Sequence, residues 1–375
     1  MVVLQYIASP FWGGGEQYVF DLAKTMRTQY NVRTVFVCQP DTPTKLIERW
    51  EQIGHVYTLH PKTKNGKFSY LEAYRLARII EREQADILHM HEMKDFFLCA
   101  YAKCFCRRQI RLIATRHIIG PAKHKASWLW VYRQIDAMIF VSQCAADAFL
   151  SQVPVRQAFR SIHIVPNSIR IPDKKAETIS LREQYNIDPS LPMVLYHGRI
   201  CPEKGILQLL QAIEPVFKGT YTIILAGQTA SESKNELERL MYHSRLKGYI
   251  LYLGFRTDCK SLIEQCLVGV LPSLVPEAAS LALLEHMAVG SAVIASDNGS
   301  QPEFVTNGKE AILLPPGKWA LWSEMIERMI NNEKEARQMG EAARKRFEHE
   351  FGYTAFTQKI YSVYTDTLPS SSSER

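Results

Sequence analysis

The segment Pro192-Met-Val-Leu-Tyr-His-Gly-Arg-Ile-Cys-Pro-Glu-Lys-Gly205 decides the architecture of this 375-residue chain. Its first five residues have the length of a strand, and a glycine and two cations separate them from the helical periodicity of Ile206–Val216. The stretch from Pro172 to Pro192 is charged, polar and bracketed by prolines. A strand–loop–helix unit that restarts after such a linker predicts a second α/β domain, and the chain is long enough for two.

On both sides of this segment, short apolar strands alternate with amphipathic helices. The predicted strands include Val2–Ile7, Val32–Cys38, Asp86–His91, Ile110–Thr115 and Ala137–Val141 before it, and Tyr221–Ala226, Ile250–Leu253, Val268–Pro272 and Ala292–Ser296 after it. Repeated βαβ units favour parallel sheets covered on both faces. The sequence therefore predicts two doubly wound parallel-sheet, Rossmann-like domains facing a central cleft. We place them at residues 1–172 and 190–350, with a last helix within residues 351–368.

Composition bounds the class of protein. Apolar residues make up 46% of the chain and charged residues 22%, which is typical of a globular protein. No apolar run approaches the roughly 20 residues of a membrane-spanning helix, and Met1–Ala8 lacks the basic region of a signal peptide. We expect a cytoplasmic protein. Most of the eight cysteines lie in apolar runs, so buried free thiols are expected.

The positive charge is concentrated in one window. Between Tyr101 and Arg170 there are eleven Lys or Arg and two Asp, a net charge of +9 in a chain of net charge +7. Trp128 and Trp130 lie among these cations. Such a stretch suits the surface of an anionic membrane, and a solvated face with tryptophans in the core explains it equally well. Nucleic acid fits less well, because no recognised binding module accompanies the charge.

The first candidate ligand loop is Gly13-Gly14-Gly15-Glu16, between the first strand and the first helix. Glycines let the backbone approach a ligand, and the amides at a helix N-terminus attract anions. A dinucleotide fingerprint needs another glycine where Tyr18 stands, so NAD binding is disfavoured. A simple tight turn is the alternative.

The second candidate is His197-Gly198-Arg199 followed by Glu203-Lys204-Gly205. Arg199 and Lys204 flank a loop that opens a helix, so both can reach one diphosphate: the guanidinium as a fork and the ammonium as a point charge. A pair of surface charges is the alternative interpretation.

The third candidate joins Pro272-Ser273, Glu277, Ser280 and Glu285. The amides of Ser280 and Leu281 open the predicted helix Leu281–Val289 and favour an anion, and carboxylates accept hydrogen bonds from sugar hydroxyls. By spacing alone, two solvated glutamates explain the pattern as well. No Asp-x-Asp pair is present to hold Mg²⁺ on a diphosphate, so no metal and no other cofactor is expected.

The fourth candidate is His117, at the carboxyl end of a predicted strand. A histidine there can contact a sugar hydroxyl or help proton transfer, and a structural or solvated histidine is the alternative. His89 and His91 alternate along a strand without a carboxylate partner, so a zinc site there is disfavoured.

Together these motifs resemble the retaining glycosyltransferases of the GT-B fold, of the bacterial group 1 type (glycosyltransferase family 4-like). The resemblance runs over nearly the whole chain. The ordered motifs that carry it are Gly13-Gly14-Gly15-Glu16, Asp86-Ile-Leu-His-Met-His91, Phe140-Val-Ser142, Val165-Pro-Asn167, Gly198-Arg199 to Lys204-Gly205, Leu253-Gly254-Phe255, and Pro272-Ser273 to Glu285.

The resemblance implies a role for each site residue. The first domain would bind a saccharide or lipid-linked acceptor, the second would bind the nucleotide-sugar donor, and the last helix would cross back to the first domain. The residues implied as catalytic are His117, Arg199, Lys204 and Glu277. Those implied in donor binding are Gly14, Gly15, Gly198, Gly254, Phe255, Ser280, Leu281 and Glu285, with Glu285 on the ribose.

The chain departs from the family pattern at three positions. Ser280 replaces a glycine, His286 follows Glu285 in place of alanine, and Asn167-Ser168 replaces Asn-Gly. A serine at position 280 is strained if the backbone there needs a positive φ. Ser280 therefore leaves open a degenerate donor-binding partner subunit. A sugar-nucleotide epimerase of the same fold is a second alternative, although it would lack the Glu-x7-Glu pattern of Glu277 and Glu285.

Overall fold

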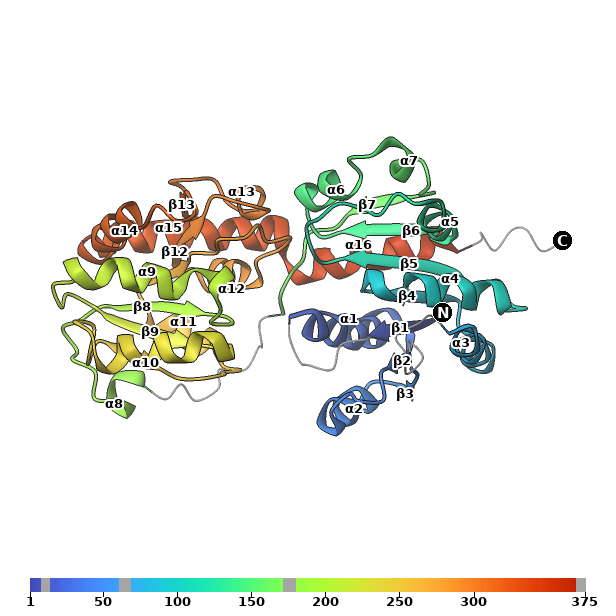
Figure 1. Cartoon of the computed structure of the whole chain (residues 1–375), viewed down its shortest axis with the longest axis horizontal. Coiled ribbons are helices and arrows are strands. Elements are labelled where there is room, and N and C mark those ends of the chain that lie inside the picture. The colour runs from blue at the N-terminus through green and yellow to red at the C-terminus, as the bar shows by residue number, and fades with distance from the viewer. Residues whose placement is uncertain (8–13, 61–68, 171–179, 369–375) are drawn as a thin grey trace. The chain divides into compact units, whose positions relative to one another are not determined.

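The computed structural model describes residues 1–7, 14–60, 69–170 and 180–368 and divides the chain into two compact units. The first is Met1–Asn167 with the C-terminal segment that begins at Tyr353, and the second is Ser168–Gly352. Both are parallel α/β units (Figure 1). None of the described helices is long and apolar enough to cross a membrane.

The described part of the first unit contains a seven-stranded sheet in the order β3-β2-β1-β4-β5-β6-β7, with parallel pairing throughout. Its strands are β1 (Val2–Ile7), β2 (Arg33–Cys38), β3 (His55–Thr58), β4 (Ile87–Met90), β5 (Arg111–Arg116), β6 (Ala137–Phe140) and β7 (Ile162–Ile164). Its main helices are α1 (Gly14–Tyr30), α2 (Thr44–Glu51), α3 (Tyr70–Glu83), α4 (Phe96–Phe105), α5 (Ala126–Gln134), α6 (Gln143–Phe149), α7 (Val153–Arg156) and α16 (Tyr353–Thr367).

The C-terminal helix α16 is part of the core of this unit. Phe356, Ile360 and Tyr364 are buried against residues of α1 and of the central strands. Tyr30 stacks on Tyr361 with ring centroids 4.3 Å apart, which fixes α16 along α1. Residues 353–367 therefore complete the N-terminal unit, although 185 residues of sequence, Ser168–Gly352, separate them from its other elements.

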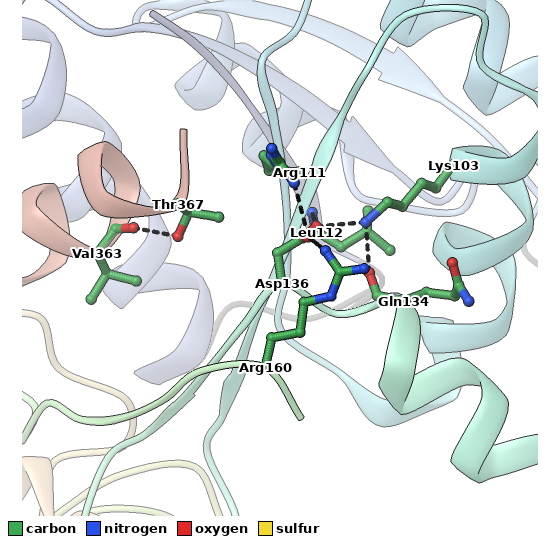
Figure 2. Close-up of polar contacts among 8 residues, drawn as sticks. All are labelled: Lys103, Arg111, Leu112, Gln134, Asp136, Arg160, Val363 and Thr367. Carbon is green, nitrogen blue, oxygen red and sulfur yellow. Dashed lines mark hydrogen bonds and ion pairs between the residues drawn. The ribbon is translucent and has the colours of Figure 1, made fainter. Parts of the chain in front are cut away.

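Asp136 ties together the amino-terminal ends of β5 and β6 (Figure 2). It accepts from the Leu112 amide at 2.9 Å, Lys103 Nζ at 2.6 Å, Arg160 Nη1 at 3.2 Å and Arg111 Nη1 at 3.3 Å. Arg111, Asp136 and Arg160 border a cavity of about 310 Å³. This cavity lies where the strands begin, opposite the edge at which His117 follows β5, so it is separate from the candidate site.

The second unit contains, among its described residues, a six-stranded parallel sheet in the order β10-β9-β8-β11-β12-β13. Its strands are β8 (Met193–His197), β9 (Thr222–Ala226), β10 (Ile250–Tyr252), β11 (Val268–Leu271), β12 (Ala292–Ser296) and β13 (Ile312–Leu314). Its main helices are α8 (Leu181–Gln184), α9 (Ile206–Ile213), α10 (Lys234–Tyr242), α11 (Cys259–Gln265), α12 (Leu281–Val289), α13 (Gln301–Phe304), α14 (Trp319–Asn331) and α15 (Glu333–Arg346).

Every strand residue of β8, β9, β11, β12 and β13 is buried, as expected for a sheet covered on both faces. Leu210, Trp322 and Ile326 pack on one side, while Leu262 and Ile263 belong to a separate core cluster with Leu195. Ser168 Oγ donates to the carbonyl of Phe351 at 2.5 Å, which joins the two ends of this unit. The serine in Asn167-Ser168 therefore has a structural role.

Candidate functional site

In each unit the strand order reverses at one place, and the candidate residues lie there. In the second unit, β9 and β10 lie on one side of β8 and β11 lies on the other. Ligands of open α/β sheets bind beyond the carboxyl ends of the strands at such a switch point. The loop after β8 carries Arg199 and Lys204, and the loop after β11 carries Glu277.

The loop after β8 depends on glycine at two positions. Gly205 has φ +70°, and a Cβ there would lie 2.1 Å from the carbonyl oxygen of Pro272. A Cβ on Gly227, in the loop after β9, would lie 1.8 Å from the carbonyl oxygen of Gly198. These close approaches draw the loops after β8, β9 and β11 together, which no side chain larger than hydrogen would permit.

The structure brings Lys204 and Glu277 together. Lys204 Nζ lies 2.8 Å from Glu277 Oε1, and both side chains are partly shielded from solvent. Arg199 is exposed, and its carbonyl accepts a hydrogen bond of 2.7 Å from Tyr196 Oη. Arg199 and Lys204 are cations that suit an anionic ligand, and the carboxylates of Glu277 and Glu203 lie beside them.

Helix α12 begins at Leu281, directly after the loop that carries Glu277. Ser280 is the N-cap residue and its hydroxyl accepts from the Leu283 amide at 3.4 Å. Its φ is −85° and ψ is 97°, an ordinary extended conformation, so the strain considered for a serine at this position is absent. Serine in place of the family's glycine therefore keeps an unstrained backbone N–H at this position.

Glu285 has a partner that sequence reasoning missed. Its Oε2 lies 2.6 Å from Nε2 of His197, the last residue of β8, which is 5% exposed. His286, the next residue of α12, is fully buried, and its ring centroid lies 5.1 Å from that of His197. Gly269 of β11 makes room for it, because a Cβ there would lie 2.3 Å from the imidazole. Burial, with His197 nearby, lowers the pKa of His286 well below its usual value.

The remaining donor-site candidates lie directly after β10 and at the start of α1. Gly254 follows β10 with φ +65°, and its carbonyl accepts from the Gly227 amide at 2.7 Å. Phe255 is 64% exposed, so its ring is available to a ligand. Gly14 and Gly15 are the exposed first residues of α1, while Gly13 lies outside the described residues.

In the first unit the strand order reverses between β1 and β4, and three histidines gather beside this point. His91 Nδ1 lies 3.2 Å from His117 Nε2, and His91 Nε2 lies 2.8 Å from Gln5 Oε1. His89 contacts Tyr364 Oη at 2.8 Å and Thr115 Oγ1 at 2.7 Å. The ring of Tyr18 meets His117 edge-on. His89 and His91 thus belong to a buried hydrogen-bond network behind His117.

This network assigns the tautomer of His117. Gln5 Nε2 donates to Tyr364 Oη at 3.2 Å, so its carbonyl oxygen faces His91 and His91 Nε2 carries a proton. Burial lowers the pKa of His91 well below its usual value, and burial and Arg116 lower that of His117 to about 4. Both rings are therefore neutral at pH 7. His91 Nδ1 accepts from His117 Nε2, which leaves Nδ1 of His117 as a hydrogen-bond acceptor.

Part of the basic window Tyr101–Arg170 is neutralised within the fold. Lys103, Arg111 and Arg160 share Asp136, and Arg108 pairs with Asp86. Trp128 and Trp130 are partly exposed, and each packs against an aromatic neighbour. Trp128 packs edge-on against Phe97 under Lys123, and Trp130 packs on Tyr101. The cations left at the surface include Arg107, Lys123, Lys125 and Arg133.

The fold and these loops define a class of protein. Two doubly wound parallel units, each with polar loops at its switch point, are the architecture of GT-B glycosyltransferases. The structure of a glycosyltransferase from Rickettsia africae ESF-5 superposes with a TM-score of 0.85 at 19% identity, covering 99% of both chains. That of Anabaena Alr3699/HepE in complex with UDP-glucose superposes with a TM-score of 0.80 at 20% identity, covering 98% of this chain and 100% of that one.

The sequence comparisons agree with the fold. Residues 177–346 match the family model described as glycosyl transferases group 1, and residues 12–171 match glycosyltransferase family 4. α-Maltose-1-phosphate synthase of Mycolicibacterium smegmatis is 26% identical over 263 residues, 66% of this chain and 67% of that one. The chain belongs to the group 1 glycosyltransferases with the GT-B fold.

Proposed function

We propose that this glycosyltransferase moves a hexosyl or related residue from a nucleotide-diphosphate sugar to a hydroxyl acceptor, with retention and without a metal ion. The observation that carries the proposal is the ion pair of Lys204 with Glu277 at the β8/β11 switch point, with Arg199 in the loop of Lys204 and α12 beginning directly after the loop of Glu277. Synthesis of a cell-surface glycan or lipid-linked saccharide is the process we propose for it.

The site can hold each part of such a donor. The diphosphate lies between Arg199, Lys204 and the amides of Ser280 and Leu281, where helix-terminal amides and cations both favour negative charge. Glu285 accepts hydrogen bonds from the ribose hydroxyls, and Glu277 accepts from a hydroxyl of the sugar. The similar structure of Anabaena Alr3699/HepE was determined in complex with UDP-glucose, which supports a nucleotide sugar as the ligand here.

The reaction breaks the bond between the anomeric carbon and the diphosphate oxygen and forms one to the acceptor oxygen on the same face of the sugar. The proton of the acceptor hydroxyl passes to the departing diphosphate. Negative charge develops on the leaving diphosphate, and Arg199 and Lys204 stabilise it there. His117, through its Nδ1, accepts a hydrogen bond from a hydroxyl of the transferred sugar.

The function is tested by measuring hydrolysis of UDP-, GDP- and ADP-sugars and by following the anomeric configuration of the released sugar by NMR. We expect turnover of one nucleotide class with a retained configuration. Turnover is expected to persist in EDTA, because Arg199, Lys204 and backbone amides stabilise the negative charge on the leaving diphosphate. Binding without any turnover would indicate a partner subunit, and loss of activity in EDTA that Mg²⁺ restores would contradict the metal-free mechanism.

The acceptor side has a surface that fits an anionic membrane. Helix α3 packs on α4, and α4 packs on α5. An aromatic patch covers them, in which Tyr70 contacts Tyr101 and Tyr74 contacts Phe105. Its exposed members, 40–58% accessible, are Tyr70, Leu71, Tyr74 and Phe105. The exposed cations Arg107, just after α4, and Lys125, just before α5, accompany these rings. Exposed rings and cations suit the headgroup level of a bilayer, so we propose peripheral contact here with a membrane that carries the acceptor.

Co-sedimentation with phosphatidylglycerol vesicles tests the membrane proposal. We expect binding at low salt that weakens at high salt, and weaker binding by the double variant Tyr74→Ser, Phe105→Ser. Tyr242→Ser, an exposed tyrosine of the second unit, is the matched control and should bind as the wild type does. Absence of binding at low salt would contradict the proposal.

A further inference from the structure

Three side chains of different chemistry meet beside the donor site of the second unit. His197 ends β8, Cys259 begins α11 and Glu285 lies in α12. One imidazole nitrogen, the thiol sulfur and one carboxylate oxygen all lie within 4.8 Å of one another. Nothing in the proposed transfer reaction uses His197 or Cys259.

Nitrogen, sulfur and carboxylate oxygen together are a ligand set for Zn²⁺. Tetrahedral zinc at its usual bond lengths keeps its ligand atoms about 3.3–3.8 Å apart. The cluster is already close to this size. Binding would open the 2.6 Å contact between His197 and Glu285 by under about 1 Å, and the ion would lie between the two side chains. Mg²⁺ and Ca²⁺ prefer oxygen-only sites, so a thiol and an imidazole select against them.

The buried imidazoles supply a second, independent observation. His197 is 5% exposed, and among the described residues its Nδ1 has no hydrogen-bond partner. His286 is 0% exposed, and neither of its ring nitrogens has a partner in that part of the chain. Buried polar atoms without partners cost free energy. Two neighbouring buried imidazoles, one of them in contact with Glu285, therefore have ring nitrogens that no described protein group partners.

We propose that His197, Cys259 and Glu285 bind Zn²⁺, and that this ion inhibits the enzyme by competing with the nucleotide of the donor. On binding, the Cys259 thiol loses its proton to solvent and its sulfur joins the zinc. Three protein ligands leave one coordination position for water. Glu285 cannot then accept from the ribose, so the competition rests on the proposed function, whereas the metal site itself does not.

Metal binding is tested on the full chain in a non-chelating reductant with Co²⁺, which reports thiolate ligation through a charge-transfer band in the near ultraviolet. We expect one equivalent of Co²⁺ to produce the band, and we expect added Zn²⁺ to abolish the band by displacing Co²⁺. The variant Cys259→Ser should lose the band while keeping the wild-type circular dichroism spectrum and Tm. Cys104→Ser, which removes an exposed thiol of the first unit, should keep it. No band in the wild type, or a band that survives in Cys259→Ser, would overturn the site.

Inhibition is tested by steady-state kinetics. Zn²⁺ should raise the KM for the donor and leave kcat unchanged, and half-inhibition of Cys259→Ser should need about tenfold more Zn²⁺ or higher. A cobalt band without competition would overturn the inhibition and the placement of the ribose at Glu285. Donor turnover without any cobalt band would overturn the metal site and leave the proposed transferase standing.

Discussion

The hydroxyl of Ser280 caps α12, whereas its backbone N–H is the group that we propose to bind the donor. Because its φ is negative and its hydroxyl caps α12, replacement by alanine removes the cap and should lower the free energy of unfolding by about 1 kcal/mol. Ser280→Gly should cost only a few tenths of that and keep donor affinity, since glycine preserves the amide. Urea unfolding and donor titration measure both. A large gain of donor affinity in Ser280→Gly would mean that serine does hinder the ligand.

Arg199 and Lys204 should each contribute to the transition state. We expect Arg199→Ala and Lys204→Ala each to lose about 2–4 kcal/mol of transition-state stabilisation, measured from kcat/KM, while Glu285→Ala acts mainly on donor affinity. The matched control is Lys334→Ala, an exposed lysine of α15 remote in sequence from the loops after β8 and β11. Near-normal kcat/KM in both cation variants would place the diphosphate elsewhere.

Gln5 acts on His117 through His91, as a positioning residue. Gln5→Leu removes the acceptor that fixes the His91 tautomer and should lower kcat/KM about tenfold, the effect of one buried hydrogen bond. Gln5→Glu keeps an acceptor and adds negative charge, which raises the pKa of the neighbouring histidines, so activity at pH 8 should survive and the acid limb of the pH–rate profile should move to higher pH. Equal profiles for both variants would contradict the relay.

At the scale of elements, the loop after β8 is held by close packing. Gly205→Ala places a Cβ against the Pro272 carbonyl at a positive φ, whereas Gly248→Ala has a similar φ, +82°, and open space around it. Both variants should lose about 1–2 kcal/mol of stability from the backbone conformation. Gly205→Ala should lose more and should also weaken donor binding, because the β8 and β11 loops must separate. Equal unfolding midpoints for the two variants would contradict this account.

Helical and strand patterns were predicted well where periodicity is strong and poorly where it is not. The pattern over Trp319–Phe347 predicts helix, and the structure divides it in two: α14 ends at Asn331, and Asn332 caps α15 through a 3.2 Å bond from the Glu335 amide. The segment of β3 has no apolar run that would reveal a strand, because none of the residues of this edge strand is fully buried. Capping and edge pairing are decided by contacts that hydrophobic periodicity does not record.

At the scale of the whole molecule, buried neutral histidines make stability depend on pH. Burial lowers the pKa of His89 from 6.5 to about 3 and that of His117 to about 4. Below pH 6.5 the unfolded chain binds protons that the folded chain does not, so stability is full above pH 6.5 and falls as the pH decreases. Each group contributes a slope of up to about 1.4 kcal/mol per pH unit. We expect the free energy of unfolding of His89→Gln, measured with urea between pH 7.5 and 4.5, to fall less steeply with decreasing pH than that of the wild type. An equal dependence on pH would contradict this assignment.

The sequence by itself determined that the chain forms two α/β units and that polar loops follow particular strands, because apolar periodicity and glycine positions are local properties. The tertiary structure alone decided which loops meet. Lys204 reaches Glu277 and His197 reaches Glu285 because β11 pairs with β8 although β9 and β10 intervene in sequence. Gln5 reaches His91 because β4 pairs with β1 in the same way. Strand order depends on how helices and strands pack across the whole unit, and no local pattern records it.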